Sequence, residues 1–581
     1  MIASSAAVAA PALRRGRSRV SMQRVVQLVL FAILLVLIVG PLVVLLRTSF
    51  NPEGTLPFGT AALTLKNYRD IFRGSATVTL ISNTLQYAGG SMILGVALAT
   101  GMAWLTERTD MPGRVPIRVL MFSWMALPPL VFGYGWILLL NPGNGVLNHV
   151  LKGMFGLAEP PLTPYGMLPL IVISGLGLTP TAFVMLSGLL RNMDPLLEDA
   201  GVVLGASRRT VIARITLPLL RPGMLSVGMF LIMTMIQAFD LPLVIGLTAQ
   251  IPVMSTRIYT LASPEVGGLP NYGLAATFGI ILLVLAMTLM WGYFRSVRIS
   301  ERFRVISGRG YRPKRLALGR WQIPAAAAMS LYFAIMLLPV LILLWASLFP
   351  FYRVPSLDQI FSVSLHAYSK MWEEPVVRRA FFNTVLLIFT SATIVIVISL
   401  LVSWYSLRGK GSLGKWLDAL SFSPIAVPPI VMAVAVLLMY LKTPLYGSIA
   451  ILIIGHVTVY VAFGTRSMIS ALIQIDKELE NAAIVSGASW ATSLRRISAP
   501  LIWPHILDCW LWLVAHSARD LTFPLLLMST SNVVGASVIW MVWDYPDLPG
   551  AAALSMILVA GLMLMVVPIH VMSARRTERE A

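Results

Sequence analysis

Long apolar stretches alternate with short polar segments along almost the whole chain. A helix that crosses the roughly 30 Å hydrocarbon core of a bilayer needs about 20 apolar residues, and such stretches recur from Val25 to Met572. Their spacing predicts about twelve transmembrane helices. The first stretch follows a basic flank and lacks a small-x-small cleavage site, so we expect it to stay as the first span. The expected fold class is an all-α polytopic membrane protein.

The predicted spans fall into two halves of six that share a sequence pattern. Asn83-Thr84 recurs 300 residues later as Asn383-Thr384, and beyond the third span an offset of 282 aligns Glu198 with Glu480. One deletion in the loop after the ninth span reconciles the two offsets. Because six is even, both halves enter the membrane in the same direction, as two pseudo-symmetric parallel repeats related by an axis along the membrane normal.

This repeat divides the chain into five parts. They are a basic N-terminal tail (1–24), a first half of six spans (25–294), a linker (295–321), a second half of six spans (322–572) and a C-terminal tail (573–581).

The net charge of +20 reflects membrane topology. With the N-terminus inside, lysine and arginine concentrate in the cytoplasmic segments, which is the positive-inside bias. The densest blocks are Arg14–Arg24, Arg295–Arg320 and Arg575–Arg579. None of them is interleaved with the aromatic residues that a nucleic-acid platform needs. We therefore expect a multi-pass protein of the bacterial inner membrane with both termini in the cytoplasm, contacting lipids and no nucleic acid.

The longest predicted cytoplasmic loop of each half lies between its fourth and fifth spans. In the first half, Asp194-Pro195 can open a short helix, Gly205 can end it in a left-handed conformation, and Ser207 can cap a second helix. The second half repeats the scheme with Asp476, Gly487 and Ser489. Two similar docking elements on one face of the protein follow from this pattern.

The sequence of these loops resembles a known motif. The segment 198–207 (EDAGVVLGAS), followed by Ile215-Thr216-Leu217-Pro218, is similar to the EAA loop of ABC importer permeases, and 480–489 with 497–500 is a second copy. In that family the short helix of the loop sits in a cleft of the cytoplasmic ATPase subunit and transmits its closure. The resemblance implies a type I importer permease fold, two copies of an ATPase, and a periplasmic or lipid-anchored binding protein.

The resemblance also implies which residues couple the permease to the ATPase. They are Glu198, Asp199, Ala200, Gly201, Gly205, Arg208, Arg209, Glu480, Asn481, Ala482, Ala483, Gly487, Arg495 and Arg496. The acidic position of the family is Asp199 in the first copy and Asn481 in the second, and the glutamate one position earlier can replace it. The alanines and Gly201 are expected to allow close approach to the partner.

Two features predict the route through the membrane. Proline pairs fall inside the third span of each half, where they remove backbone donors and break the helix. Charged residues within a span are costly and usually face a cavity, and we expect Asp240 and Asp520 at equivalent depth in the fifth spans. An ion pair between Arg519 and an aspartate is the structural alternative. The predicted path residues are Pro128, Pro129, Asp240, Pro428, Pro429, Arg519 and Asp520.

The chain is not expected to be an enzyme or to hold a cofactor. The segment Gly409–Lys415 has the spacing of a phosphate-binding loop, but Trp416 stands where Ser or Thr would ligate Mg²⁺. ATP and Mg²⁺ are therefore expected on the partner ATPase. No metal site is predicted, because His456 and His516 are isolated and Cys509 is the single cysteine.

The sequence is compatible with more than one substrate and with more than one class of transporter. The fused arrangement and Arg519-Asp520-Leu521 resemble the ferric-iron permeases, while permeases for thiamine, polyamines, phosphonates and phosphorylated sugars are alternatives. A secondary transporter with twelve spans is the alternative from another class. Its signature would lie in the loop Glu107–Pro116, which lacks the expected Gly-rich basic pattern.

Overall fold

The computed structural model describes residues 22–58, 62–191, 196–263, 270–302, 316–409, 411–545 and 547–580. Within these ranges the chain is built from α-helices with short 3₁₀ and π-helical turns, and the only β-type pairing is one isolated bridge between Thr109 and Leu316. The expected all-α fold is confirmed.

The helices of the first half follow the chain from α1 to α13. They are α1 (Met22–Leu34), α2 (Gly40–Thr48), α3 (Lys66–Arg73), α4 (Ser75–Arg108), α5 (Arg114–Trp124), α6 (Pro129–Leu140), α7 (Val146–Phe155), α8 (Met167–Arg191), α9 (Leu196–Val203), α10 (Arg208–Val211), α11 (Leu217–Gln237), α12 (Met254–Ala262) and α13 (Tyr272–Arg302).

The second half repeats this order. It comprises α14 (Gln322–Ser347), α15 (His366–Glu373), α16 (Pro375–Arg408), α17 (Leu413–Phe422), α18 (Pro429–Tyr440), α19 (Ile449–Leu472), α20 (Lys477–Val485), α21 (Trp490–Ser493), α22 (Ala499–Leu501), α23 (Trp503–Arg519), α24 (Thr522–Leu527), α25 (Gly535–Asp544) and α26 (Leu548–Glu580).

Among the described residues, nine helices are long and apolar enough to cross a membrane, and three bent helix pairs bring the number to twelve if each pair is one span. Two of the bends lie at the predicted proline pairs. The chain turns by 99° between α5 and α6 and by 109° before α18. Pro128 and Pro428 are extended and stand just before the new helix, so the predicted helix breaks are confirmed.

The third bend is confined to the second half. Trp490–Leu501 and Trp503–Arg519 meet at 78°, whereas the corresponding part of the first half forms one span, Ala213–Gln237. Both fifth spans end earlier than expected, at Gln237 and Arg519. Asp520 consequently lies just past a helix end, in backbone that has left the helix, whereas Asp240 begins the helical segment that follows the break at Ala238 and Phe239. Neither lies inside one continuous span, contrary to what the sequence suggested.

Two helices continue past the predicted domain ends. The last helix of the first half, α13, reaches Arg302, and α26 reaches Glu580, although the linker and the tail were placed from 295 and 573. Arginine and glutamate favour helix, so a helix can continue beyond the apolar stretch from which its end was predicted.

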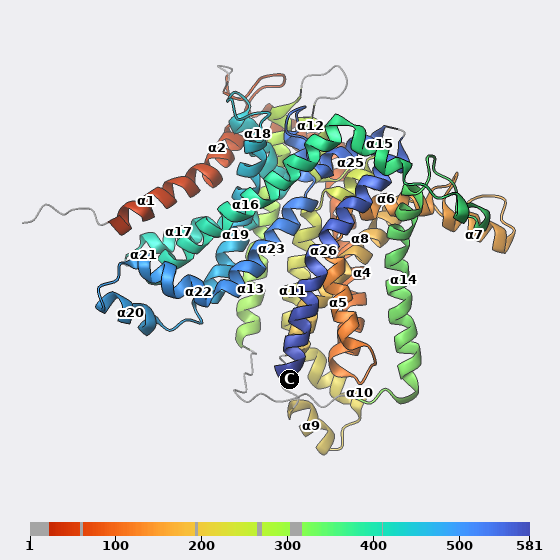
Figure 1. The fold of residues 1–581 in the computed structure, drawn as a ribbon, viewed down its shortest axis with the longest axis horizontal. Coiled ribbons are helices and arrows are strands. Elements are labelled where there is room, and N and C mark those ends of the chain that lie inside the picture. The colour runs from red at the N-terminus through yellow and green to blue at the C-terminus, as the bar shows by residue number, and fades with distance from the viewer. Residues whose placement is uncertain are drawn as a thin grey trace, which may run out of the picture.

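The first span of each half packs against the other half. In Figure 1, α1 lies beside α16 and α17 at the left, while α14 runs along the right side of the first half. Close backbone approach makes the second contact possible, since a Cβ on Gly135 of α6 would lie 2.4 Å from the Pro339 carbonyl oxygen of α14. The Tyr332 hydroxyl of α14 also donates to the Leu176 carbonyl at 3.2 Å. This exchange ties the two halves together.

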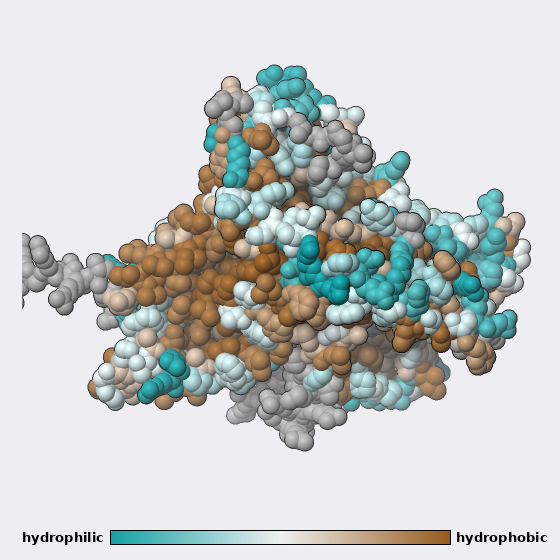
Figure 2. Space-filling model, turned by 45° about the horizontal axis from the view of Figure 1, so that its top comes forward, coloured by the Kyte–Doolittle hydropathy of each residue, from teal (hydrophilic) through white to brown (hydrophobic). Residues whose placement is uncertain are grey.

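The surface carries the apolar area that a membrane protein needs. Figure 2 shows a broad hydrophobic region on the left of the view, with hydrophilic residues at the top, on the right and in the middle of the view. Exposed apolar side chains include Leu28 and Val29 on α1 and Phe382 and Phe389 on α16. Lipid, and not water, is the fitting environment for this area. The chain is a multi-pass membrane protein.

The end of the linker is attached to the first half. Backbone bonds join Leu316 to Arg108 and Asp110, at 2.9 and 3.0 Å. The Asp110 carboxylate accepts from the Leu318 N–H at 2.8 Å and from the Gln322 amide at 3.0 Å. The Leu318 N–H is the main reason why the pKa of Asp110 lies below its ordinary value. The linker therefore ends beside the last residues of α4.

Candidate coupling loops and central cavity

The first loop between a fourth and a fifth span has the predicted turn geometry. Gly205 has φ +83°, and the Ala206 N–H donates back to the Gly201 carbonyl at 3.1 Å, which closes the end of α9. The Thr210 N–H donates to the Ser207 hydroxyl at 3.2 Å, as expected of a helix cap. Asp194 and Pro195 lie outside the described residues.

The second loop has the same geometry at the positions that the repeat predicts. Asp476 caps α20 by accepting from the Glu478 N–H at 3.1 Å, and Gly487 has φ +88°. The Ser489 hydroxyl accepts from the Thr492 N–H at 3.2 Å. Figure 1 places α9 at the bottom of the molecule and α20 at its lower left. The two loops therefore present similar elements on one side.

The glutamates of these loops point toward the permease's own helices, which corrects the expectation that they replace a surface charge. Glu480 is 3% exposed; its carboxylate accepts from Arg408 Nε at 3.0 Å and from the Ser498 hydroxyl at 2.7 Å. Glu198 accepts from Arg108 at 3.5 Å and from the Thr216 hydroxyl at 2.8 Å. Each glutamate anchors its loop to the end of the second span.

The anchor arginines were missed by sequence reasoning, although the repeat could have revealed them. Arg108 and Arg408 are 300 residues apart, which is the offset of the first part of each half. The two anchors are not equally satisfied. Arg408 also donates to the carbonyls of Leu472 and Ile475, whereas two nitrogens of buried Arg108 have no hydrogen-bond partner within the described ranges.

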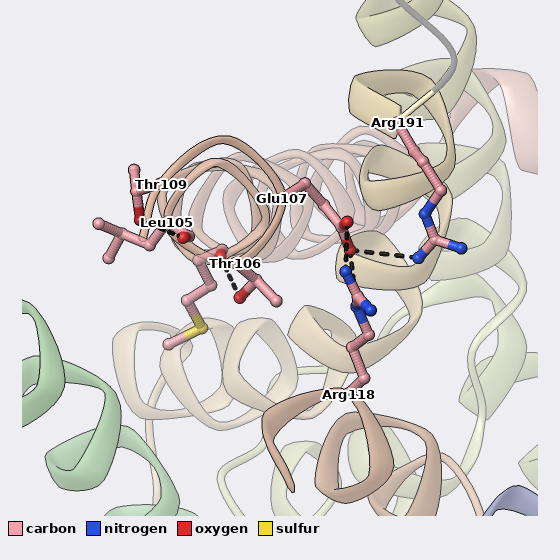
Figure 3. Close-up of polar contacts among 7 residues, drawn as sticks. Leu105, Thr106, Glu107, Thr109, Arg118 and Arg191 are labelled. Carbon is pink, nitrogen blue, oxygen red and sulfur yellow. Dashed lines mark hydrogen bonds and ion pairs between the residues drawn. The ribbon is translucent and has the colours of Figure 1, made fainter. Parts of the chain in front are cut away.

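A second charged cluster stands beside the first anchor. Figure 3 shows Arg118 of α5 and Arg191 of α8 converging on Glu107, the neighbour of Arg108 at the end of α4. Arg118 binds both carboxylate oxygens at 2.9 and 2.6 Å, and Arg191 approaches at 3.3 Å. Such bidentate contact fixes direction as well as distance. It ties the start of the first coupling loop to α4 and α5.

The exposed part of each loop is apolar at its end. Val203 is 85% exposed and Val485 is 88% exposed. Ala200, Asn481 and Ala482 are exposed, and so are Arg495 and Arg496, while Ala483 is half-buried. Gly201 is buried. A Cβ at this position would lie only 2.8 Å from the Ile215 side chain of the same loop, so a larger residue would not fit. Its small size therefore serves packing inside the loop, contrary to the expectation of close approach to a partner. The side chains of Asp199, Arg208 and Arg209 lie outside the described part of the structure.

A cavity of about 440 Å³ lies next to the helix breaks. Pro129, Pro429, Asp240 and Arg519 are among the residues that line it, so the structure brings four of the predicted path residues together. Pro128, Pro428 and Asp520 are not among its lining residues. Most of the wall belongs to the first half, and the second half contributes Met336, Ile425, Pro429, Arg519 and Thr522.

The alternative ion pair between Arg519 and an aspartate does not form with Asp520. The Asp520 carboxylate lies 3.0 Å from Nε2 of buried His456 and accepts from the Phe523 N–H at 3.3 Å. Arg519 instead donates to the Met125 carbonyl, at the break between α5 and α6. His456 is thus a hydrogen-bonded histidine, and no cluster of three metal-ligating side chains occurs in the described ranges.

The two aspartates do not occupy equivalent positions either. The offset of 282 that aligns the loops also aligns the helix ends Gln237 and Arg519, and it places Ala238, not Asp240, opposite Asp520. The equivalent of Asp240 is Thr522. All four of Gln237, Asp240, Arg519 and Thr522 line the cavity, so the two helix ends meet there with different side chains.

Aromatic side chains stand in the second half where the first half is polar or small. Phe463 and His516 each stack on Trp512 with ring centroids 3.5 Å apart. By the same offset, Phe463 and His516 correspond to Thr181 and Thr234, which line the cavity. Ser174, the counterpart of His456, lines it as well.

Comparison with known proteins decides the family. Residues 91–298 match the binding-protein-dependent transport system inner membrane components, a range that includes the first coupling loop and most of the cavity wall. The chain is an ABC importer permease. Its second half lies beyond this match and is linked to the family by the repeated loop and by longer relatives.

Several other permeases are similar to this one. The ferric transport system permease protein of Actinobacillus pleuropneumoniae is 26% identical over 77% of this chain, which spans 63% of that protein's length. An Fe(3+)-transport system permease protein of Haemophilus influenzae is 22% identical over 79% of this chain and 83% of its own. The molybdenum transport system permease protein of Haemophilus influenzae is 33% identical over 26% of this chain and 63% of its own. The permease is thus related to the ferric-iron group, with a fused, two-half type I fold.

Proposed function

We propose that this permease imports ferric iron, which a periplasmic or lipid-anchored binding protein delivers to its outer face. Two copies of a cytoplasmic ATPase supply the energy, and ATP and Mg²⁺ bind to those subunits. Both termini then lie in the cytoplasm of a bacterium, on the side of the coupling loops. The proposal of iron as the substrate is based on the similarity of most of this chain to ferric transport permeases.

The pair of anchored loops carries the proposal for the ATPase. Each loop is held from behind by a glutamate bound to the end of the second span, at 3.5 Å in the first half and 3.0 Å in the second. Each leaves a nearly fully exposed valine, Val203 or Val485, at the end of its short helix. An apolar tip on a rigidly held helix suits insertion into a protein cleft. Two such tips favour two partner subunits.

The cavity at the helix breaks supports a path between the halves. Irregular backbone at membrane depth is tolerated where it is buried in protein or lines a water-filled space, and Pro129, Pro429, Asp240 and Arg519 line such a space. Closure of the ATPases would move the loops and, through their anchors, the ends of α4 and α16. A path that changes its opening with ATP follows from this linkage.

Molybdate is the second candidate substrate, because the permease of a molybdenum transport system matches part of the chain. Thiamine, polyamines, phosphonates and phosphorylated sugars remain further alternatives from the sequence. The binding protein of the system would determine which of these solutes reaches the permease.

Native mass spectrometry and uptake test the proposal together. The assembled complex should contain one permease chain and two ATPase chains, and the permease alone should hydrolyse no ATP. Proteoliposomes with the binding protein should accumulate ⁵⁵Fe³⁺ only when ATP is present, and excess molybdate should not compete. Two permease chains per complex would overturn the assembly, and uptake of molybdate in place of iron would overturn the substrate.

A further inference from the structure

Two buried donor nitrogens in the cavity wall have no hydrogen-bond partner among the described residues. They are the Trp124 indole nitrogen and the Gln237 amide nitrogen, and both residues line the cavity. Leaving a buried donor unsatisfied costs free energy, so two such donors in one place point to something that binds them. Water or a polar ligand is needed to complete this wall.

The charges on the wall restrict what that ligand can be. Asp240 supplies one carboxyl group and Arg519 one guanidinium, so the wall carries a single acidic and a single basic side chain. No cation of the described residues lies within ion-pairing distance of the Asp240 carboxylate. The indole and amide nitrogens are donors only. Hence the wall offers several donors, a single carboxyl group and little net charge.

The geometry points to a binding site for a small, oxygen-rich solute of low net charge in this cavity. For a ferric cargo, this means iron that still carries its oxygen ligands and not the bare ion, an inference that rests on the proposed function. A bare trivalent cation needs several anionic oxygen ligands and is costly to bury without them. The ligand's own oxygen atoms would instead accept from Trp124, Gln237 and Arg519.

The size of the space fits such a solute. About 440 Å³ is within the roughly 300–1,000 Å³ of ordinary small-molecule pockets. It far exceeds the roughly 30 Å³ share of one water. The site also has no second copy related by the repeat, because Phe463 and His516 occupy the positions that correspond to Thr181 and Thr234. We therefore expect one ligand per permease chain.

Direct binding tests the inference apart from transport. The permease–ATPase complex, without nucleotide or binding protein, is dialysed against ferric citrate labelled with ⁵⁵Fe and ¹⁴C. Both labels should bind in a constant ratio at one site per chain. Retention of ⁵⁵Fe without ¹⁴C would overturn the low-charge class of ligand, and retention of neither label would overturn the site.

Exchange of side chains between the halves locates the ligand. Thr181→Phe places in the first half the residue that the second half already has at position 463, and it should lower affinity at least tenfold. Phe463→Thr is the matched control in the second half and should leave affinity unchanged. Unchanged affinity in Thr181→Phe, or a loss only in Phe463→Thr, would contradict the placement.

Because Thr181→Phe fills the cavity and could disturb folding, a second variant with a smaller change is also tested. Trp124→Phe keeps a ring but removes the indole N–H, so binding should weaken by roughly threefold to tenfold, as expected for one hydrogen bond. Thermal melting of each variant complex shows that it has folded. If the complex binds both labels but imports no iron with ATP and binding protein, the proposed transport fails while the site stands. If the complex imports iron but retains neither label in the binding assay, the proposed transport stands and the site fails.

Discussion

The fifth spans of the two halves end at the same place in the fold, at Gln237 and at Arg519, but their surroundings differ. Around Gln237 a cavity remains, and Ser174, Thr181 and Thr234 stand in its wall where the second half has His456, Phe463 and His516. Around Arg519 the rings of Phe463, Trp512 and His516 stack on one another. A duplicated backbone has thus kept its shape while the side chains at its centre diverged.

Contacts that hold the backbone are the same in both halves. The Ser49 and Tyr68 hydroxyls lie 2.8 Å apart, as do those of Ser347 and Tyr368. The Thr84 hydroxyl accepts from a helix-start N–H at 3.0 Å, and the hydroxyl of Thr384 does so at 2.8 Å. The comparison teaches that polar contacts between spans preserve the fold, while the lining of the central space can specialise in one half.

The largest expected effect distinguishes the two loop anchors. Glu480→Ala leaves Arg408 buried without its partner, and breaking a buried ion pair costs about 3–5 kcal/mol. The Glu198 side chain is 23% exposed against 5% for Glu480, and its arginine is more distant, so Glu198→Ala should cost less. Thermal melting of the complex and ATPase stimulation by the binding protein measure both effects.

Glu478→Ala is the control for the second anchor, since this side chain lies exposed on the same helix, α20. It should leave melting unchanged. Equal losses for Glu198→Ala and Glu480→Ala would mean that the two anchors are equivalent despite their different burial.

The second prediction contrasts the two aspartates. Asp520→Asn weakens the 3.0 Å contact with His456, and hydrogen bonds to charged groups contribute about 1.5–3 kcal/mol. This variant should therefore melt at a lower temperature. Asp240→Asn should melt like the wild type but lose uptake, because its carboxylate faces the cavity.

Thiol labelling sharpens this contrast. In a Cys509→Ser background, Asp240→Cys should react with a small membrane-impermeant thiol reagent from one side, at a rate that ATP changes. Asp520→Cys should react slowly and independently of ATP, since its position is turned toward His456. ATP-dependent labelling at 520 and none at 240 would reverse the assignment.

The third prediction concerns the loop glycines. Gly205 and Gly487 have positive φ, and nothing lies within 4 Å of a Cβ built on either, so a side chain meets only the backbone penalty. Gly205→Val and Gly487→Val should each cost about 1–2 kcal/mol and reduce uptake per ATP hydrolysed. Gly205→Asn is the control, because asparagine tolerates this conformation better. Normal coupling in both valine variants would show that the loops do not transmit closure.

The smallest effect is expected at the described end of the linker, which the first half contacts through Asp110. The Leu318 N–H keeps the pKa of this carboxyl below its ordinary value. The attachment is therefore complete at neutral pH and is lost as pH falls through that lowered pKa. Asp110→Asn should make the linker slightly more sensitive to protease at pH 7 without changing uptake. Unaltered cleavage would show that the backbone pairing of Leu316 suffices.

Local sequence determined the elements of this protein. Apolar length gave the spans, the proline pairs gave the two breaks at α5–α6 and α17–α18, and glycine and serine at fixed spacing gave the turns of both coupling loops. These signals work because each depends on neighbours within a few residues: helix length, a missing N–H, or a left-handed turn.

Only the tertiary structure decided which side chains meet. Glu198 looked like a surface charge until Arg108, 90 residues earlier, was found beside it. Arg519 had an aspartate next to it in sequence, yet it bonds to Met125, 394 residues away. The cavity is likewise formed by residues from both halves. Buried polar groups take whatever partner the packing of distant helices brings within reach, and no local pattern in the chain encodes that choice.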